Sequence, residues 1–139
     1  MPQMNADERR IPDPLTQSVI GAFYEVYSEL GFGFLEAVYR RALEVALVDR
    51  GHRVAAESPI AVCFRGWSVG DYRADLLVDG RLLVEVKAGG GLVSGHRAQL
   101  LNYLRATTVE VGLLVNFGPK LDFERLVFAN ERKRTGSRW

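Results

Sequence analysis

YRADLLVDGRLLVEVK, residues 72–87, is the segment that says most about the fold of this chain. It places the carboxylates of Asp75 and Glu85 and the ammonium of Lys87 inside two apolar, β-forming runs separated by Asp79-Gly80. A charge buried in an apolar strand is costly unless a cation or several hydrogen bonds compensate it. Two neighbouring carboxylates need a metal ion or a shared proton. The segment therefore predicts two paired strands that carry a reactive group of charges.

The connection between the two runs decides whether the two acids can meet. With a plain two-residue loop, Asp75 would lie opposite Val84, and side-chain alternation would send Glu85 to the other face of the sheet. An offset of one residue brings the acids together. We therefore predict a three-residue connection or a bulge, with Gly80 at positive φ.

Length and composition indicate one globular domain. The chain has 139 residues, of which 47% are hydrophobic and 25% are charged. We expect a flexible N-terminus over residues 1–12, the domain over 13–129, and a basic, solvated tail over 130–139. The net charge of +1 excludes little, since a nucleic-acid enzyme can hold an acidic centre inside a basic rim.

Targeting signals are not evident in the sequence. No apolar run is long enough to span a bilayer, and the start of the chain lacks the basic and apolar regions of a signal peptide. The single cysteine, Cys63, has no disulfide partner, and we expect it to be a buried, inert thiol. These features predict a cytoplasmic protein that does not associate with membranes.

Hydrophobic periodicity and punctuation by glycine and proline predict the order of the elements. Two helices that pack as a hairpin come first, then a group of strands, a third helix and two more strands. The predicted helices cover 13–30, 35–50 and 95–106, and the predicted strands cover 54–57, 60–65, 67–69, 72–78, 81–87, 111–117 and 123–129. This order predicts an α/β fold in which a mixed β-sheet is covered by helices on both faces.

Several blocks of the chain match a known family. Residues 33–39, GFLEAVY, fit a Gly-x-x-Glu-x-x-Tyr signature, and Asp75 followed by Glu85-x-Lys87 fits the pattern of a metal-dependent nuclease. Residues 98–104 and 112–118 look like the later blocks of the same family. The chain resembles the GxxExxY protein family, a branch of the PD-(D/E)xK nuclease-like superfamily. The resemblance implies a restriction-endonuclease-like core preceded by a helical hairpin.

The resemblance also implies roles for individual residues. Mg²⁺ or Mn²⁺ would be bound by oxygen ligands, as hard divalent ions prefer at phosphate sites. Lys87 lies two residues after Glu85, on the same strand face, and would stabilise negative charge that develops on phosphorus. The implied metal ligands are Glu36, Asp75, Glu85 and Val86, and the implied catalytic residues are Glu36, Asp75, Glu85, Lys87 and Gln99.

Three of the polar candidates have alternative interpretations. Glu36 is either a third acid near the metal or a surface residue that complements the helix dipole. Tyr39 either contacts Glu36 or a phosphate, or packs in the core. His96 either contacts phosphate or water, or begins a surface helix. Tyr103 shares a helix face with Gln99 and could direct its hydroxyl at the site, so Tyr39, His96 and Tyr103 are the candidates for substrate binding.

The function predicted from the sequence is that of a metal-dependent nuclease that hydrolyses DNA or RNA by water attack. A homodimer is considered, because a domain this small would need a second subunit to hold duplex DNA and cut both strands. The first alternative is a non-catalytic, nuclease-like module that binds nucleic acid or a protein partner. The second is an interaction domain in which Glu85 and Lys87 form an ordinary salt bridge. Residues 88–95 contain more glycine than the family's usual charged connection, which makes substrate contacts after Lys87 harder to predict.

Overall fold

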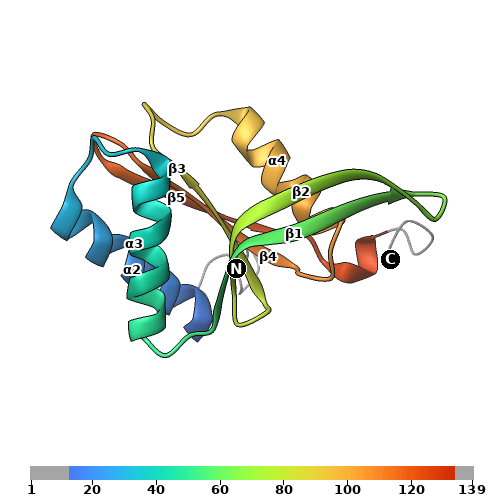
Figure 1. Ribbon diagram of the computed structural model, residues 1–139, viewed down its shortest axis with the longest axis horizontal. Coiled ribbons are helices and arrows are strands. Elements are labelled where there is room, and N and C mark those ends of the chain that lie inside the picture. Colours follow the sequence, from blue (N-terminus) through green and yellow to red (C-terminus); the bar gives the residue numbers. More distant parts are fainter. Residues whose placement is uncertain (1–12, 134–139) are drawn as a thin grey trace, which may run out of the picture.

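The structure of the protein is a computed structural model that describes residues 13–133. Its centre is one five-stranded sheet in the order β1-β2-β3-β4-β5 (Figure 1). Only β3 and β4 pair in parallel, and the other neighbours are antiparallel. The strands are β1 Val54–Phe64, β2 Trp67–Val78, β3 Leu82–Lys87, β4 Val111–Phe117 and β5 Leu121–Val127.

Helices cover both faces of this sheet. Helices α2 (Pro14–Leu30) and α3 (Glu36–Asp49) pack on one face, against the side chains of Leu82, Val84 and Val86 in β3. Helix α4 (Ser94–Arg105) covers the opposite face, against Leu83 and its neighbours. The alternation along β3 thus fills two cores, as expected for a central strand. The predicted mixed α/β fold with an initial helical hairpin is confirmed.

Local signals in the sequence set the ends of the hairpin helices. The Asp13 carboxylate accepts a hydrogen bond of 2.9 Å from the Thr16 N–H, which caps α2, and Pro14 occupies its first turn. Gly31, at φ 67°, ends α2, and Gly33 follows at φ 115°, a conformation that favours glycine. The chain therefore reverses tightly, and α3 begins directly afterwards at Glu36.

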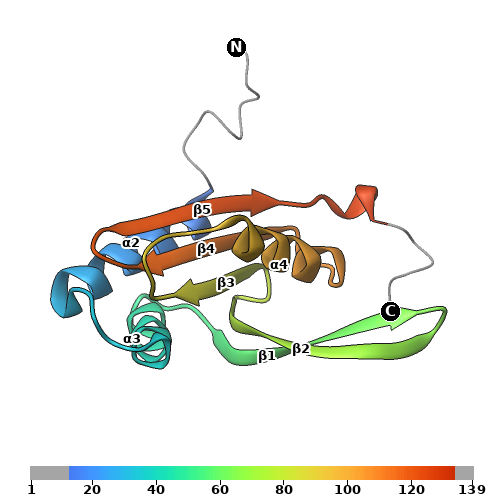
Figure 2. The same cartoon turned by 90° about the horizontal axis from the view of Figure 1, so that it is seen from above.

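The first two strands are longer than predicted. The sequence predicted four short strands between residues 54 and 78, whereas β1 and β2 are continuous and form an arm that extends past the end of β3 (Figures 1 and 2). Pro59 lies between the first two predicted strands, but it pairs with Arg73 on the edge strand β1, where its missing N–H is tolerated. The strand also continues through Glu57, which has a positive φ of 52°.

The end of the described chain packs on the domain. Asn130–Arg132 form a short 3₁₀ turn, η1, and the buried Lys133 donates hydrogen bonds to the carbonyls of Thr107 and Val109 at 2.8 and 2.9 Å. The predicted tail boundary at residue 130 is therefore wrong, because these four residues are anchored. The expectations for 1–12 and 134–139 lie outside the described residues. Between 13 and 133, no helix is long and apolar enough to cross a membrane.

The β2–β3 connection has the geometry predicted from the sequence. Val78 pairs with Leu82 and Leu76 with Val84, so Asp79, Gly80 and Arg81 form a three-residue connection. Asp79 and Gly80 have φ values of 52° and 66°. Asp and Gly are the residues that adopt this left-handed region most readily. The connection therefore places position 75 opposite position 85.

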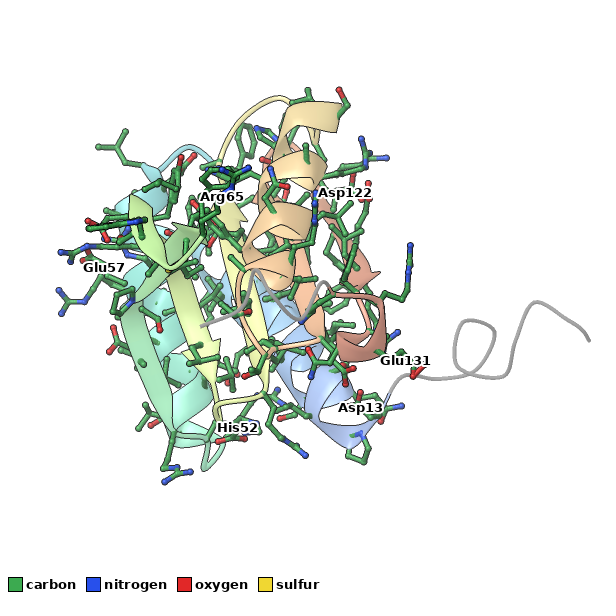
Figure 3. The ribbon with its side chains drawn as sticks, turned by 90° about the vertical axis from the view of Figure 1, so that its right-hand side faces the viewer. Asp13, His52, Glu57, Arg65, Asp122 and Glu131 are labelled. Carbon is green, nitrogen blue, oxygen red and sulfur yellow. The ribbon has the colours of Figure 1, made fainter. Side chains whose placement is uncertain are left out.

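Side chains from three segments hold this connection in place. The Asp79 carboxylate lies 2.7 Å from His52 Nδ1 and accepts a hydrogen bond of 2.8 Å from the Arg53 N–H. His52 Nε2 in turn lies 2.8 Å from the Ser18 hydroxyl on α2 (His52 is labelled in Figure 3). Hydrolases use the same three residue types as a catalytic relay, but the backbone N–H groups around Ser18 are bonded within a helix and cannot form an oxyanion hole. The array ties the connection to α2 and to the segment between α3 and β1.

Replacing Asp79 tests this anchor. Asp79→Ala removes both hydrogen bonds and leaves an alanine at positive φ, so we expect unfolding in urea to show a loss of about 1–2 kcal/mol. Hydrogen bonds from Arg53 and His52 lower the pKa of Asp79. The stabilisation is thus present above its ordinary pKa and fades as pH falls through the lowered value. Asp79→Asn, which keeps an acceptor and tolerates positive φ, should lose clearly less. Equal losses for the two variants would contradict the anchor.

Candidate active site

Asp75 and Glu85 face each other where β2 separates from β3. The backbone pairing of these two strands ends at the pair Leu76–Val84. At the next position the side chains replace it: Glu85 Oε2 accepts from the Asp75 N–H, and Asp75 Oδ2 accepts from the Val86 N–H, each at 2.7 Å. Each carboxylate is thus fixed by the backbone of the opposite strand. The two acids share one face, as the register predicted.

Lys87 and Gln99 lie beside this pair on the α4 side of the sheet. Lys87 ends β3 and its ammonium donates to Gln99 Oε1 on α4 at 3.3 Å. Because residues 85 and 87 alternate with 86, Glu85 and Lys87 project from the same strand face. The structure therefore brings together Asp75, Glu85, Lys87 and Gln99, four of the five residues that the resemblance implied to be catalytic.

Arg40 and Asn116 were not predicted from the sequence. Arg40 on α3 lies 3.8 Å from Asp75 Oδ1 and 3.8 Å from Glu57. Asn116, buried in β4 beside Lys87, accepts from the Gly89 N–H at 2.9 Å and donates to the Gly89 carbonyl at 3.1 Å. A polar residue in the apolar strand 111–117 was the available signal for Asn116. No signal in the sequence pointed to Arg40, since an arginine on a helix is usually a surface residue.

The chain at Gly89, after β3, packs against Gly118, after β4. A side chain at Gly118 would approach the Gly89 carbonyl to 2.5 Å, so the two backbones pack directly on each other. Together with Asn116, this contact fixes the chain immediately after Lys87. The contact requires glycine at position 118, whereas a side chain at Gly89, Gly90 or Gly91 would meet nothing within 4 Å.

The two carboxylates are short of positive charge. Desolvation is the main cause that raises the pKa of Asp75, opposed by the Val86 N–H, Arg40 and Lys87. Glu85 is only 4% exposed, and burial followed by the charge of Asp75 raises its pKa to about 7. The cations present only partly compensate the pair.

Glu36 lies near the pair without joining it. It is exposed in the first turn of α3, and its charge contributes to raising the pKa of both Asp75 and Glu85. No group of three or more His, Cys, Asp or Glu side chains close enough to hold a metal is found within residues 13–133. Its role as a third metal ligand therefore stays a prediction.

Tyr39 is a core residue, which is the second of the two interpretations that the sequence left open. Its side chain is completely buried and stacks on Phe117, with ring centroids 4.5 Å apart. Its hydroxyl donates to the Gly31 carbonyl at 2.7 Å and accepts from the Phe34 N–H. In the Gly-x-x-Glu-x-x-Tyr signature, Tyr39 thus holds the loop that contains Gly33 and so places Glu36 at the start of α3.

His96 and Tyr103 are both on α4, but in different environments. His96 Nδ1 accepts from the Val93 N–H at 3.2 Å, which caps the helix, and burial followed by Lys87 lowers its pKa. The structure thus favours the interpretation of His96 as a residue that begins the helix. Tyr103 is buried next to Tyr72, and desolvation and the two acids raise its pKa.

Cys63, on β1, is a half-buried thiol, so the expectation that it is buried is wrong.

The donor chemistry of the pair fits a divalent cation. Asp75 and Glu85 supply oxygens only, which is the ligand type that Mg²⁺ and Mn²⁺ prefer. The Val86 N–H is used by Asp75, so Val86 can contribute only its backbone carbonyl. A cation between the carboxylates would offset the desolvation that raises both pKa values.

A mixed sheet with helices on both faces and a carboxylate pair at a strand fork is the core of the restriction-endonuclease-like α/β proteins. A family model described as the PD-(D/E)XK nuclease superfamily matches residues 13–126. The chain belongs to this superfamily. No curated protein matches the sequence of this chain.

The fold is similar to one in a solved structure, the crystal structure of SSO0001. The sequence identity is 20% and the TM-score is 0.52, so the likeness concerns the fold alone. It covers 68% of this chain and 50% of that chain. This chain therefore spans about half the length of that protein.

The raised pKa of Glu85 makes metal-free stability depend on pH. The folded state holds the Glu85 proton up to about pH 7, whereas the unfolded chain releases it near 4.5. Stability should thus fall as pH rises through this window, by about 3 kcal/mol at 1.36 kcal/mol per pKa unit. Urea unfolding in EDTA at about pH 5 and pH 8 measures this fall.

Two variants and added metal complete the test. Glu85→Gln cannot ionise and should remove most of the fall, whereas Glu29→Gln, an exposed carboxylate on α2, should keep the wild-type profile. Millimolar Mg²⁺ or Mn²⁺ should stabilise wild-type protein at high pH by mass action, and should not stabilise Glu85→Gln to the same extent. A flat wild-type profile together with no response to metal would rule out a strained carboxylate pair.

Proposed function

We propose that this protein is a metal-dependent nuclease that hydrolyses phosphodiester bonds of DNA or RNA by water attack. The observation that supports it best is the facing pair of Asp75 and Glu85, with Lys87 projecting beside them and bonded to Gln99. This is an acidic site for a hard cation with an adjacent ammonium. Membership of the nuclease superfamily supports the same chemistry.

Each residue has a distinct proposed role. Asp75 and Glu85, with the Val86 carbonyl and Glu36, would hold Mg²⁺ or Mn²⁺, which supplies Lewis-acid stabilisation of the phosphate when bound. Lys87 places a positive charge where negative charge develops on the phosphoryl oxygens. Gln99 orients the Lys87 ammonium through their hydrogen bond. Arg40 would neutralise Asp75 from the opposite side.

Within the superfamily, we assign the chain to the GxxExxY branch. Residues 33–39 support this, because Gly33 has a positive φ and Tyr39 fixes the same loop, which gives the spacing of the signature a physical reason. The homodimer considered from the sequence stays a prediction. Nucleic acid is the proposed partner.

Cleavage assays on single- and double-stranded DNA and RNA, with Mg²⁺ or Mn²⁺ against EDTA, test the proposal. Lys87 acts mainly on charge that develops in the transition state, so Lys87→Ala should lower the cleavage rate roughly a hundredfold while affinity changes only several-fold. Asp75→Ala should abolish cleavage.

Arg81→Ala is the matched control. It removes a cation at the other end of the same strand, in the exposed β2–β3 connection, and should leave cleavage unchanged. Wild-type protein that binds nucleic acid, cleaves none of the four substrates with either metal, and loses affinity in Lys87→Ala would replace the nuclease with a non-catalytic binding module.

A further inference from the structure

A broad groove of about 910 Å³ runs along α4. It begins beside Gln99, next to the β2–β3 fork. One wall is the arm formed by β1 and β2, and the other is α4 followed by the segment that contains η1. The arm and η1 extend toward the same end of the molecule (Figures 1 and 2). The volume lies at the upper end of the range for ligand pockets. The groove is therefore large enough for an extended ligand.

The charge of the groove is one-sided. Its lining includes the exposed cationic side chains of Arg105 and Arg132, and no aspartate or glutamate within residues 13–133 lines it. The ammonium of Lys133, which also lines it, is buried and bonded to backbone carbonyls. The neighbouring acid, Glu131, is exposed and projects from the outer edge of η1 (Figure 3). An overall charge of +1 thus conceals a local cationic surface. A polyanion would be attracted to it.

Both arginines lie over one ring. The guanidinium carbons of Arg132 and Arg105 lie 4.9 and 6.0 Å from the centroid of Phe128. Stacking of this kind orders the guanidinium plane and leaves its N–H groups available. Arginine in this state is well suited to bidentate contacts with phosphate.

The opposite wall presents an aromatic face. Tyr72, on β2, is 50% exposed and its ring centroid lies 5.9 Å from that of the buried Tyr103. Tyr103 and Gly70 thus pack against parts of this ring, and the rest of it is exposed. An exposed aromatic ring next to ordered cations is the combination that binds unpaired bases, because every base has a face that can stack.

The groove is continuous with the proposed catalytic site. Gln99 lines the groove and also accepts the hydrogen bond from the Lys87 ammonium. Asn102, Tyr103 and Arg105 follow Gln99 along the next turns of α4 and also line the groove. A strand whose phosphate lay at Lys87 would therefore have a path along α4 to Arg105 and Arg132.

We propose that this groove binds a single strand of nucleic acid, with phosphates on Arg105 and Arg132 and a base stacked on Tyr72, as the strand leaves the catalytic site. The inference rests on the proposed nuclease function and names its substrate class. A duplex is disfavoured because its bases are already stacked on each other and cannot meet the Tyr72 ring. The exposed residues at the tip of the arm, Phe64, Trp67 and Val69, are also apolar and do not read base edges.

Fluorescence anisotropy in EDTA separates binding from cleavage. The probes are a short labelled oligothymidylate, the matching oligouridylate and a duplex of the same length. We expect the single strands to bind more tightly than the duplex. Tyr72→Ala should weaken single-strand binding about fivefold or more, whereas Tyr24→Ala, which removes an equally exposed tyrosine on α2, should have no effect.

The arginines are tested by the salt dependence of the same binding. Arg105→Gln with Arg132→Gln should weaken binding and reduce the slope of log K against log salt by about 1.4, at roughly 0.7 per phosphate contact. Arg41→Gln, an exposed arginine on α3, should keep the wild-type slope. Melting temperatures of all variants show that each is folded.

The groove and the nuclease proposal fail in different ways. Wild-type protein that cleaves with metal, while the groove variants bind single strands as wild type does, would overturn the groove and leave the nuclease intact. Tighter binding of the duplex than of either single strand would also overturn it. If the groove variants lose binding but wild-type protein never cleaves, the groove stands and the catalytic proposal falls.

Discussion

The reciprocal contact between Asp75 and Glu85 is the interaction on which the candidate site depends. Each carboxylate accepts a hydrogen bond from the backbone of the opposite strand at 2.7 Å, in the place where the next ladder bonds would lie. This arrangement ends the pairing of β2 with β3 and brings two acids together inside the protein. Burial makes the pair costly when it is ionised, and the raised pKa values of both acids express that cost. A site that holds such a pair is suited to a cation.

The surrounding fold is arranged so that this contact can form. The three-residue connection at Asp79 sets the register, and its link through His52 to Ser18 ties that register to α2. Beyond the fork, β2 is free to continue with β1 as an arm, which creates one wall of the groove. On the other side of β3, Asn116 and Gly118 fix the chain after Lys87. The same separation of strands thus produces both the acid pair and the surface that leads away from it.

Much of this was predictable because the signals are local. Asp13-Pro14, Gly31 and Gly51 mark helix ends, and alternation fixed which face Glu85 and Lys87 share. Counting residues across Asp79-Gly80 was enough to predict the offset that pairs Asp75 with Glu85. The errors concern tertiary context. Pro59 breaks a central strand but is tolerated at an edge, which the sequence does not reveal. Tyr39, Arg40 and Lys133 have polar groups whose partners come from distant or irregular segments, so neither spacing nor composition predicted them.

Crystals of the protein soaked in Mn²⁺ would test the central claim most directly, because anomalous scattering locates the ion independently of any assay. We predict one strong peak within ligand distance of both the Asp75 and Glu85 carboxylates, about 2.0–2.2 Å from an oxygen of each, as for small divalent ions. The peak should disappear in Asp75→Ala crystals. A peak elsewhere, or none beside the pair while both carboxylates keep their hydrogen bonds to the opposite strand, would contradict the account.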